Sequence, residues 1–176
     1  MSEVIIRDRA IVEDDWTHLA DDALLPASGK LIVTHVRWLK EKDALKARGN
    51  VGVKIPGTLT VDELKDDLPA LALIALVFDF IQPKPEGGRT FDGRAYTQAR
   101  VLRERLGYKG EIRATGGVFR DAMYYMARCG VNAFEVKNPA DALNAFKDFS
   151  LGYQGAADDP TPIFRRRGVG VVAPRH

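Results

Sequence analysis

Three small residues, Thr115, Gly116 and Gly117, stand between a short β-branched segment and an amphipathic helical pattern. A turn of this kind leaves backbone N–H groups free in front of a helix N-terminus, and both features attract anions. Nearby arginines would add bidentate cationic donors. The spacing therefore predicts an anion-binding set of Arg94, Arg113, Thr115, Gly116, Gly117 and Arg120. The alternative is a tight strand-to-helix turn that needs glycine only for its backbone conformation.

Seven arginines lie between residues 91 and 136, although the whole chain has a net charge of only +2. Helical spacing places them on two flanks of an apolar stripe rather than in one patch. Arginine interleaved with tyrosine is typical of protein interfaces. The predicted partner-docking residues are Tyr96, Arg100, Arg103, Tyr124 and Arg128. The alternative is a solvated face with pairs such as Arg100–Glu104, which contribute little stability.

Ligands of parallel α/β proteins gather where strands end and helices begin. This rule selects His35, Asp79 and Lys137 as cleft candidates. An aspartate, a hydroxyl and a lysine after successive strands resemble a phosphoacceptor receiver domain. Such a domain needs acidic residues after its first strand to hold Mg²⁺, and His35-Val36-Arg37 stands there instead. Phosphotransfer and a metal site are therefore not expected.

Strand and helix patterns alternate from Lys30 onward. The predicted strands are Leu31–Val36, Val51–Ile55, Leu71–Phe80, Glu111–Ala114 and Ala133–Val136. Helices are predicted to end near Arg48, to begin at a capping box of Thr60 and Glu63, and to span Arg94–Leu106, Val118–Arg128 and Ala140–Phe149. The segment Ile81–Thr90 is rich in Pro and Gly and is predicted to be a loop.

Five βα units with short connections favour a parallel sheet with right-handed crossovers. We expect an α/β fold with a flavodoxin-like three-layer sandwich, and the alternative is a partial β/α barrel. The predicted organisation is an N-terminal hairpin or extension over residues 1–29, a βα core over 30–149 and an irregular tail over 150–176. The turn of the hairpin is expected at Arg7-Asp8-Arg9.

Composition restricts the class of protein. With 176 residues and 45% hydrophobic content, the chain is long enough for one globular core. The near-neutral charge excludes the strongly basic signature of a nucleic-acid binder. No apolar run in the N-terminal region is long enough for a membrane span, and Cys129 is the single cysteine. We therefore expect a cytoplasmic protein without an intramolecular disulfide.

Long segments of the chain resemble a known family. They are DGRAYTQARVLRERLGYKGEIRA (92–114), VFRDAMYYMARCGVNAFEV (118–136), Tyr153-Gln154 and PIFRRR (162–167). They look like the bacterial domain-of-unknown-function family number nine hundred and thirty-four, which is encoded beside sulfite reductase. Its members carry the label of probable oxidoreductases involved in sulfite reduction. The resemblance extends from Asp14-Asp15-Trp16 to the arginine-rich tail.

Two functions follow as hypotheses. In the first, the protein is an accessory factor of assimilatory sulfite reduction and of cysteine biosynthesis. It would dock on sulfite reductase, or on an acidic electron carrier, through its arginine-rich face. In the second, it is an oxidoreductase-like enzyme that holds sulfite, sulfate or a phosphorylated metabolite at Thr115–Gly117. No motif indicates a cofactor, and a homodimer through Ile163 and Phe164 is a further hypothesis.

Overall fold

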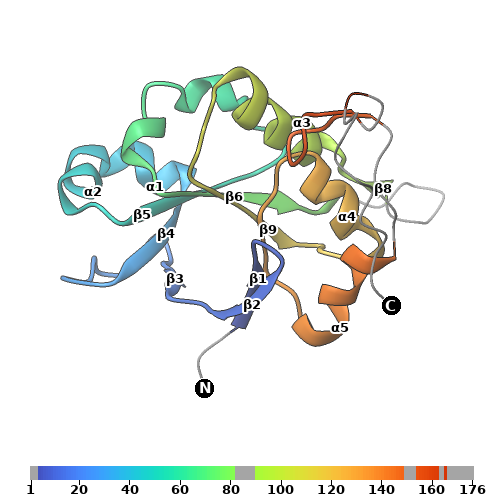
Figure 1. Ribbon diagram of the computed structural model, residues 1–176. Coiled ribbons are helices and arrows are strands. Elements are labelled where there is room, and N and C mark those ends of the chain that lie inside the picture. Colours follow the sequence, from blue (N-terminus) through green and yellow to red (C-terminus); the bar gives the residue numbers. More distant parts are fainter. Residues whose placement is uncertain (1–3, 82–89, 149–153, 163–164, 166–176) are drawn as a thin grey trace.

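The computed structural model describes residues 4–81, 90–148, 154–162 and 165. Within these residues the fold is mixed α/β, and eight strands form one sheet in the order β2-β1-β10-β9-β6-β5-β4-β3 (Figure 1). The five central strands are parallel to one another. They are β4 (Lys30–Thr34), β5 (Val51–Ile55), β6 (Leu73–Phe78), β9 (Glu111–Gly116) and β10 (Ala133–Phe134).

The helices and helical turns connect these strands. The α-helices are α1 (His35–Lys40), α2 (Lys42–Arg48), α3 (Arg94–Arg100), α4 (Arg120–Arg128) and α5 (Pro139–Leu143). The shorter segments are η1 (Val61–Leu64), η2 (Leu68–Ala70), the π-helical turn η3 (Val101–Arg105) that continues α3, and η4 (Asn144–Lys147). Thr60 begins η1 without a side-chain cap, so the predicted capping box is not formed.

The parallel strands lie side by side in chain order. A flavodoxin-like sheet instead changes direction along its strand order, and this change places helices on both faces. With a sequential order, right-handed crossovers bring successive helices to the same face. Consistent with this rule, α1 packs against β4 and β5, and α3 packs against β6 (Figure 1). The flavodoxin-like prediction is therefore not confirmed, and the sheet is a curled half-barrel of the alternative type.

The N-terminal segment supplies three further strands to this sheet. Strands β1 (Val4–Arg7) and β2 (Ala10–Glu13) form an antiparallel hairpin, and β1 also runs antiparallel to β10. Asp8 and Arg9 form its turn with positive φ angles of 50° and 62°, so the predicted hairpin is confirmed. Strand β3 (Trp16–His18) pairs with β4 at the opposite edge. The sheet is thus partly antiparallel.

The short link between β2 and β3 shows how strongly the sheet is curled. The two strands form opposite edges of the sheet, yet only Asp14 and Asp15 separate them in the chain. Eight flat strands would be about 34 Å across at about 4.8 Å per step. The link can span roughly 11 Å at most. The sheet must therefore curl until its edges approach each other, and its inner face is enclosed.

Successive side chains of a strand point to opposite faces of the sheet, and this alternation separates two sets of buried residues. The main core lies between the sheet and the helices, and Val53, Ile74 and Ile112 belong to it. A smaller apolar cluster lies on the inner face and is formed by Trp16, Ile32, Leu73 and Ala75. A two-stranded sheet of β7 (Phe80–Ile81) and β8 (Thr90–Phe91) flanks the main sheet. The intervening Pro- and Gly-rich stretch and the tail residues Ile163 and Phe164 lie outside the described residues.

Candidate functional site: an inner-face charge network and an exposed aromatic face

Arg113 is the centre of a charge network on the inner face of the sheet. Its side chain is fully buried. The guanidinium donates two hydrogen bonds to the Asp14 carboxylate, at 2.8 and 3.0 Å, and a third to Glu111 at 2.7 Å. Glu135 accepts a longer bond from Arg113 at 3.3 Å. Glu111 also accepts a bond from Arg7, so the network joins three segments that are distant in sequence.

His18 extends this network across the curled sheet. Its Nε2 lies 2.8 Å from Oε1 of Glu135 and thereby connects edge strand β3 to the end of β10. Burial alone would raise the pKa of Glu135, but the bond to His18 and the charge of Arg113 outweigh burial and hold that pKa below its ordinary value. Burial likewise opposes the charge of Arg113, and its carboxylate partners nevertheless raise its pKa. The network therefore stabilises the charged forms of Glu135 and Arg113.

The structure does not assemble the anion-binding set predicted around Thr115–Gly117. Arg113 belongs to the inner-face network, where carboxylates already bind its guanidinium. The Arg94 guanidinium contacts Asp92 at 2.7 Å, and Arg120 contacts Asp148 at 2.7 Å. The buried Thr115 hydroxyl donates to the carbonyl oxygen of Leu76 at 3.5 Å.

The glycine at position 116 has a local structural reason. Gly116 has a φ of 84°, in the left-handed region that favours glycine. A Cβ at this position would lie 2.6 Å from the carbonyl oxygen of Phe78. The same oxygen accepts a hydrogen bond from the Gly117 N–H. The turn therefore needs glycine for close approach to the preceding strand, as the alternative interpretation of this sequence proposed.

Two of the arginines predicted to dock a partner instead bind other segments of the same chain. Arg103 donates hydrogen bonds to the carbonyl oxygens of Tyr108, Gly110 and Gly130 and to the side chain of Asn132, at 2.7–2.9 Å. Arg128 donates to the Gln154 carbonyl oxygen and lies 3.8 Å from Asp158. Arginine suits this role because its planar group carries five donors.

The other docking candidates remain at or near the surface. Arg100 is exposed and pairs with Glu104 at i,i+4, as the solvated-face alternative expected. Tyr96 is partly buried on the same flank of α3, where burial raises the pKa of its hydroxyl. Tyr124 on α4 is also partly buried. The five predicted docking residues therefore do not form a single face.

The three cleft candidates do not meet in one cleft. His35, Asp79 and Lys137 follow β4, β6 and β10, and another strand lies between each successive pair. Asp79 is exposed, accepts a hydrogen bond from the Phe80 N–H and makes no ion pair within the described part of the chain. Lys137 is exposed. Nε2 of His35 is buried without a hydrogen-bond partner among the described residues.

A cluster of aromatic side chains reaches the surface beside α3 and α4, and of its members the sequence pointed only to Tyr96. We call Phe80, Phe91, Tyr96, Phe119 and Tyr125 the aromatic face. Its ring centroids are 5.0–6.3 Å apart along Tyr125–Tyr96–Phe91–Phe119, and Phe80 lies 5.8 Å from Phe119. The buried ring of Phe78 packs against Tyr96 and Phe91 below it.

The outer ends of the aromatic face are open to solvent. Phe119 is 46% exposed and Tyr125 is 59% exposed. The five rings come from four separate segments of the chain, so no local sequence pattern indicates the cluster. The one feature of the sequence that could have indicated the aromatic face is the number of aromatic residues near the carboxyl ends of β6 and β9.

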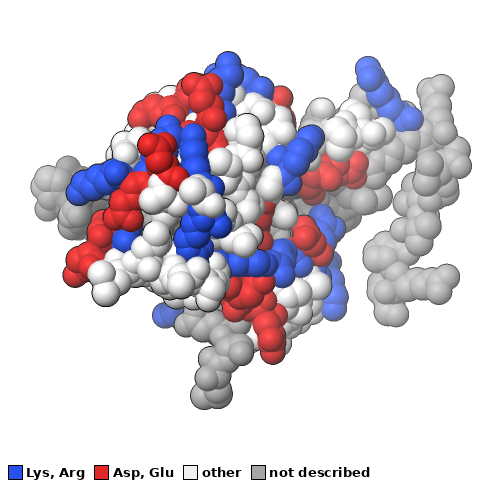
Figure 2. Space-filling model, turned by 90° about the vertical axis from the view of Figure 1, so that its left-hand side faces the viewer, with Lys and Arg blue, Asp and Glu red and all other residues white. Residues whose placement is uncertain are grey.

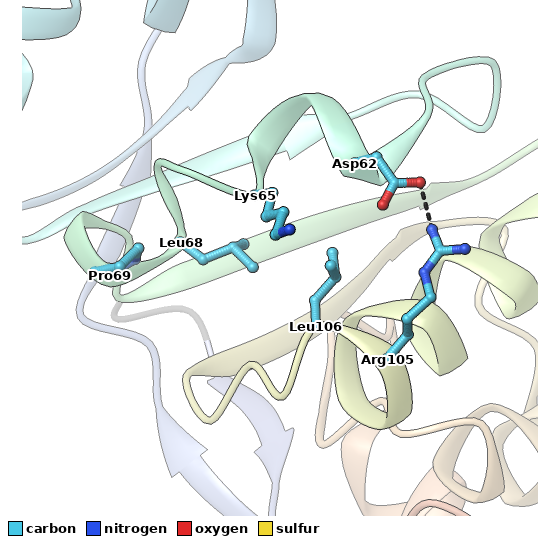
Figure 3. Close-up of a pocket in the computed structure, with 6 residues that line it drawn as sticks. All are labelled: Asp62, Lys65, Leu68, Pro69, Arg105 and Leu106. Carbon is cyan, nitrogen blue, oxygen red and sulfur yellow. Dashed lines mark hydrogen bonds and ion pairs between the residues drawn. The ribbon is translucent and has the colours of Figure 1, made fainter.

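A shallow hollow of about 470 Å³ lies on the helical side of the molecule (Figure 3). It is lined by Asp62, Lys65, Leu68, Pro69, Arg105 and Leu106. Arg105 is paired with Asp62 at one end. The hollow lies near the amino ends of β6 and β9, since η2 and Leu106 precede those strands. Catalytic residues of barrel folds gather at the other end of the strands, so the hollow is a poor candidate for an active site.

Charges of both signs are interspersed on the face that carries α1 and α2 (Figure 2). No large patch of one sign covers it in that view. In the described ranges, no group of three or more His, Cys, Asp or Glu side chains is arranged to hold a metal ion. The described helices also include none that is long and apolar enough to cross a membrane.

Comparison with known proteins assigns the chain to a family without assigning an activity. Residues 52–164 match the family model described as bacterial protein of unknown function (DUF934). The match covers more than half of the sequence, and the chain therefore belongs to this family. It includes β5 to β10, the aromatic face and Arg113. No curated protein matches the chain.

Proposed function

We propose that this protein is an accessory factor of assimilatory sulfite reduction that docks on sulfite reductase through its aromatic face. The observation that carries the proposal is the exposure of Phe119 and Tyr125 at the outer ends of a continuous ring cluster. Single exposed apolar residues are common and need no explanation. Two exposed rings that are joined through the partly buried rings of one cluster are different, because contiguous exposed apolar patches mark interaction sites.

The aromatic face can supply useful binding energy. An aromatic side chain buries 150–250 Å² when fully covered, so two half-exposed rings retain roughly 100 Å² each. At about 25 cal/mol per Å², covering each ring is worth about 2–3 kcal/mol before the cost of association. The inner rings already hold Phe119 and Tyr125 in place, which lowers the entropy lost when a partner binds. This arrangement is typical of an interface hot spot.

The charges around the aromatic face favour one of the two partner types. Arg94, Arg100 and Arg120 each contact a carboxylate of this chain. Their cations are therefore largely compensated, and an acidic electron carrier would find little net attraction. A partner with an apolar patch fits better. We take sulfite reductase as that partner because of the family resemblance, and the electron carrier becomes the other outcome of the test.

The proposal is tested by co-elution of the purified protein with purified sulfite reductase in gel filtration. We expect a complex with the unaltered chain and none with Phe119→Ser or Tyr125→Ala. The matched control is Leu39→Ser, because Leu39 is 57% exposed and belongs to α1, which lies apart from α4 (Figure 1). Co-elution that survives both aromatic substitutions, or that occurs only with an acidic electron carrier, would overturn the proposal.

A further inference from the structure

Lys54 is a charged side chain on the inner face of the sheet that the functions considered above do not use. Its neighbours in β5, Val53 and Ile55, both point into the main core. Successive side chains of a strand alternate between faces, so Lys54 points to the inner face. Its register partners on the adjacent strands are Thr34 and Ala75. Arg113 follows in the same row, beside Ala75.

The inner face opens to solvent at the carboxyl ends of the parallel strands. Ile32 and Leu73, which lie one row deeper on the inner face, are fully buried. Thr34, Lys54, Val77 and Glu135, which lie nearer the strand ends, are only partly buried. This decrease in burial toward the strand ends places Lys54 at the open end of the curled sheet, which we call the mouth. Parallel α/β folds bind their ligands at this end of the strands.

The acidic groups of the inner face are bound to other cations. Asp14 and Glu111 contact Arg113, Glu111 also contacts Arg7, and Glu135 contacts Arg113 and His18. At the mouth, Asp21 accepts a hydrogen bond from the Thr34 hydroxyl at 2.6 Å. Lys54 itself makes no hydrogen bond or ion pair with the described residues.

The Lys54 ammonium group lies on a partly enclosed face, and no described carboxylate is paired with it. A bound anion would supply the missing charge. Lysine is also a compact point charge on a flexible stem, and proteins use it in this form to hold phosphate-like groups.

We propose that Lys54 is the cationic residue of an anion-binding site at the mouth of the inner face, and that the site takes a small oxyanion. The site is distinct from the aromatic face and from the Thr115–Gly117 turn. Lys54 contributes the charge, and the partly open inner face admits the ligand. This inference does not depend on the docking function, because the two sites use different residues on different elements.

The test measures the melting temperature of the full-length protein during titration with sodium sulfate, sodium sulfite and sodium phosphate. A ligand that binds the folded state raises the melting temperature along a saturable curve. We expect saturation with at least one anion, and at least a tenfold weaker apparent affinity in Lys54→Met and Lys54→Gln. Lys109→Met is the matched control, because Lys109 is an exposed lysine that precedes β9.

Sodium chloride at equal ionic strength separates specific binding from screening. Equal affinities in the unaltered protein and in both Lys54 variants would overturn the proposal, as would the absence of saturable binding of all three anions. Loss of affinity in Lys109→Met to the same degree would also overturn it. Tyr125→Ala is expected to retain anion binding, and this result keeps the test independent of partner docking.

Discussion

Replacement of Arg113 by methionine tests the inner-face network. The substitution keeps most of the volume of the side chain but removes all its hydrogen bonds to Asp14, Glu111 and Glu135. The carboxylates that remain are mostly buried and lose their shared cation. Removal of one partner from a buried ion pair costs about 3–5 kcal/mol. We expect a loss of this size from the free energy of unfolding.

The assay is urea denaturation followed by circular dichroism at pH 7, with the melting temperature as a second measurement. For a protein of this size, each kcal/mol corresponds to roughly 2–4 °C, so a decrease of about 6–20 °C is expected. Arg100→Met is the matched control. Arg100 is 57% exposed and pairs with the exposed Glu104, so its loss should leave the unfolding free energy nearly unchanged.

The loss of unfolding free energy in Arg113→Met should depend on pH, and the lowered pKa of Glu135 sets the direction of that dependence. The pKa of Glu135 is held low in the folded protein, so its ionised form adds stability above its unfolded pKa and loses it as the pH falls. Without Arg113, the carboxylates repel one another and favour protonation. The penalty should therefore shrink between about pH 5 and pH 3. A penalty below about 1 kcal/mol at pH 7, or one that grows on acidification, would refute the reasoning.

Two further predictions concern buried structural sites. Asp67 accepts a hydrogen bond from Trp38 and contacts Lys42. Burial opposes the charge of Asp67, but these partners lower its pKa from 3.8 to about 2. The charged form of Asp67 should add about 2–3 kcal/mol to the free energy of unfolding at neutral pH, and this contribution should be lost between about pH 4 and pH 2. Asp67→Asn should abolish that part of the acid dependence, measured by urea denaturation. Gly116→Ala should lower the unfolding free energy by about 1–3 kcal/mol, because Gly116 has a positive φ and lies close to the preceding strand. The control is Gly93→Ala, which should be near neutral in the same assay because Gly93 has a φ of −78° and open space around its Cβ position. A Gly116→Ala variant as stable as the Gly93→Ala control would contradict this account of the turn.

The order of elements could be predicted from the sequence, but the path of the sheet could not. Segments such as Val51–Ile55 and Arg94–Leu106 have local periodicity that fixes strand or helix, and the structure confirms both types of element. Strand order depends on contacts between distant segments. The pairing of β1 with β10, for example, joins residues more than 120 positions apart. Alternation alone therefore left two architectures open.

The roles of the arginines depend on the same long-range contacts. Arg103 and Arg113 look like members of a charged surface because other charged residues, such as Glu104 and Glu111, stand close to them in the sequence. In the fold, carbonyl oxygens and carboxylates from other segments bind them inside the molecule. The aromatic face was missed for a related reason, because Phe91, Phe119 and Tyr125 meet only when β6, β9 and their loops are brought together.

The affinity of purified sulfite reductase for the unaltered protein and for Tyr125→Ala tests the central claim most directly. Removal of a half-exposed aromatic anchor should cost about 2 kcal/mol, which weakens binding roughly 30-fold. Because the surrounding arginines are paired, affinity should change little between low and high salt. Equal affinities for the two proteins, or binding that disappears at high salt, would contradict docking through the aromatic face.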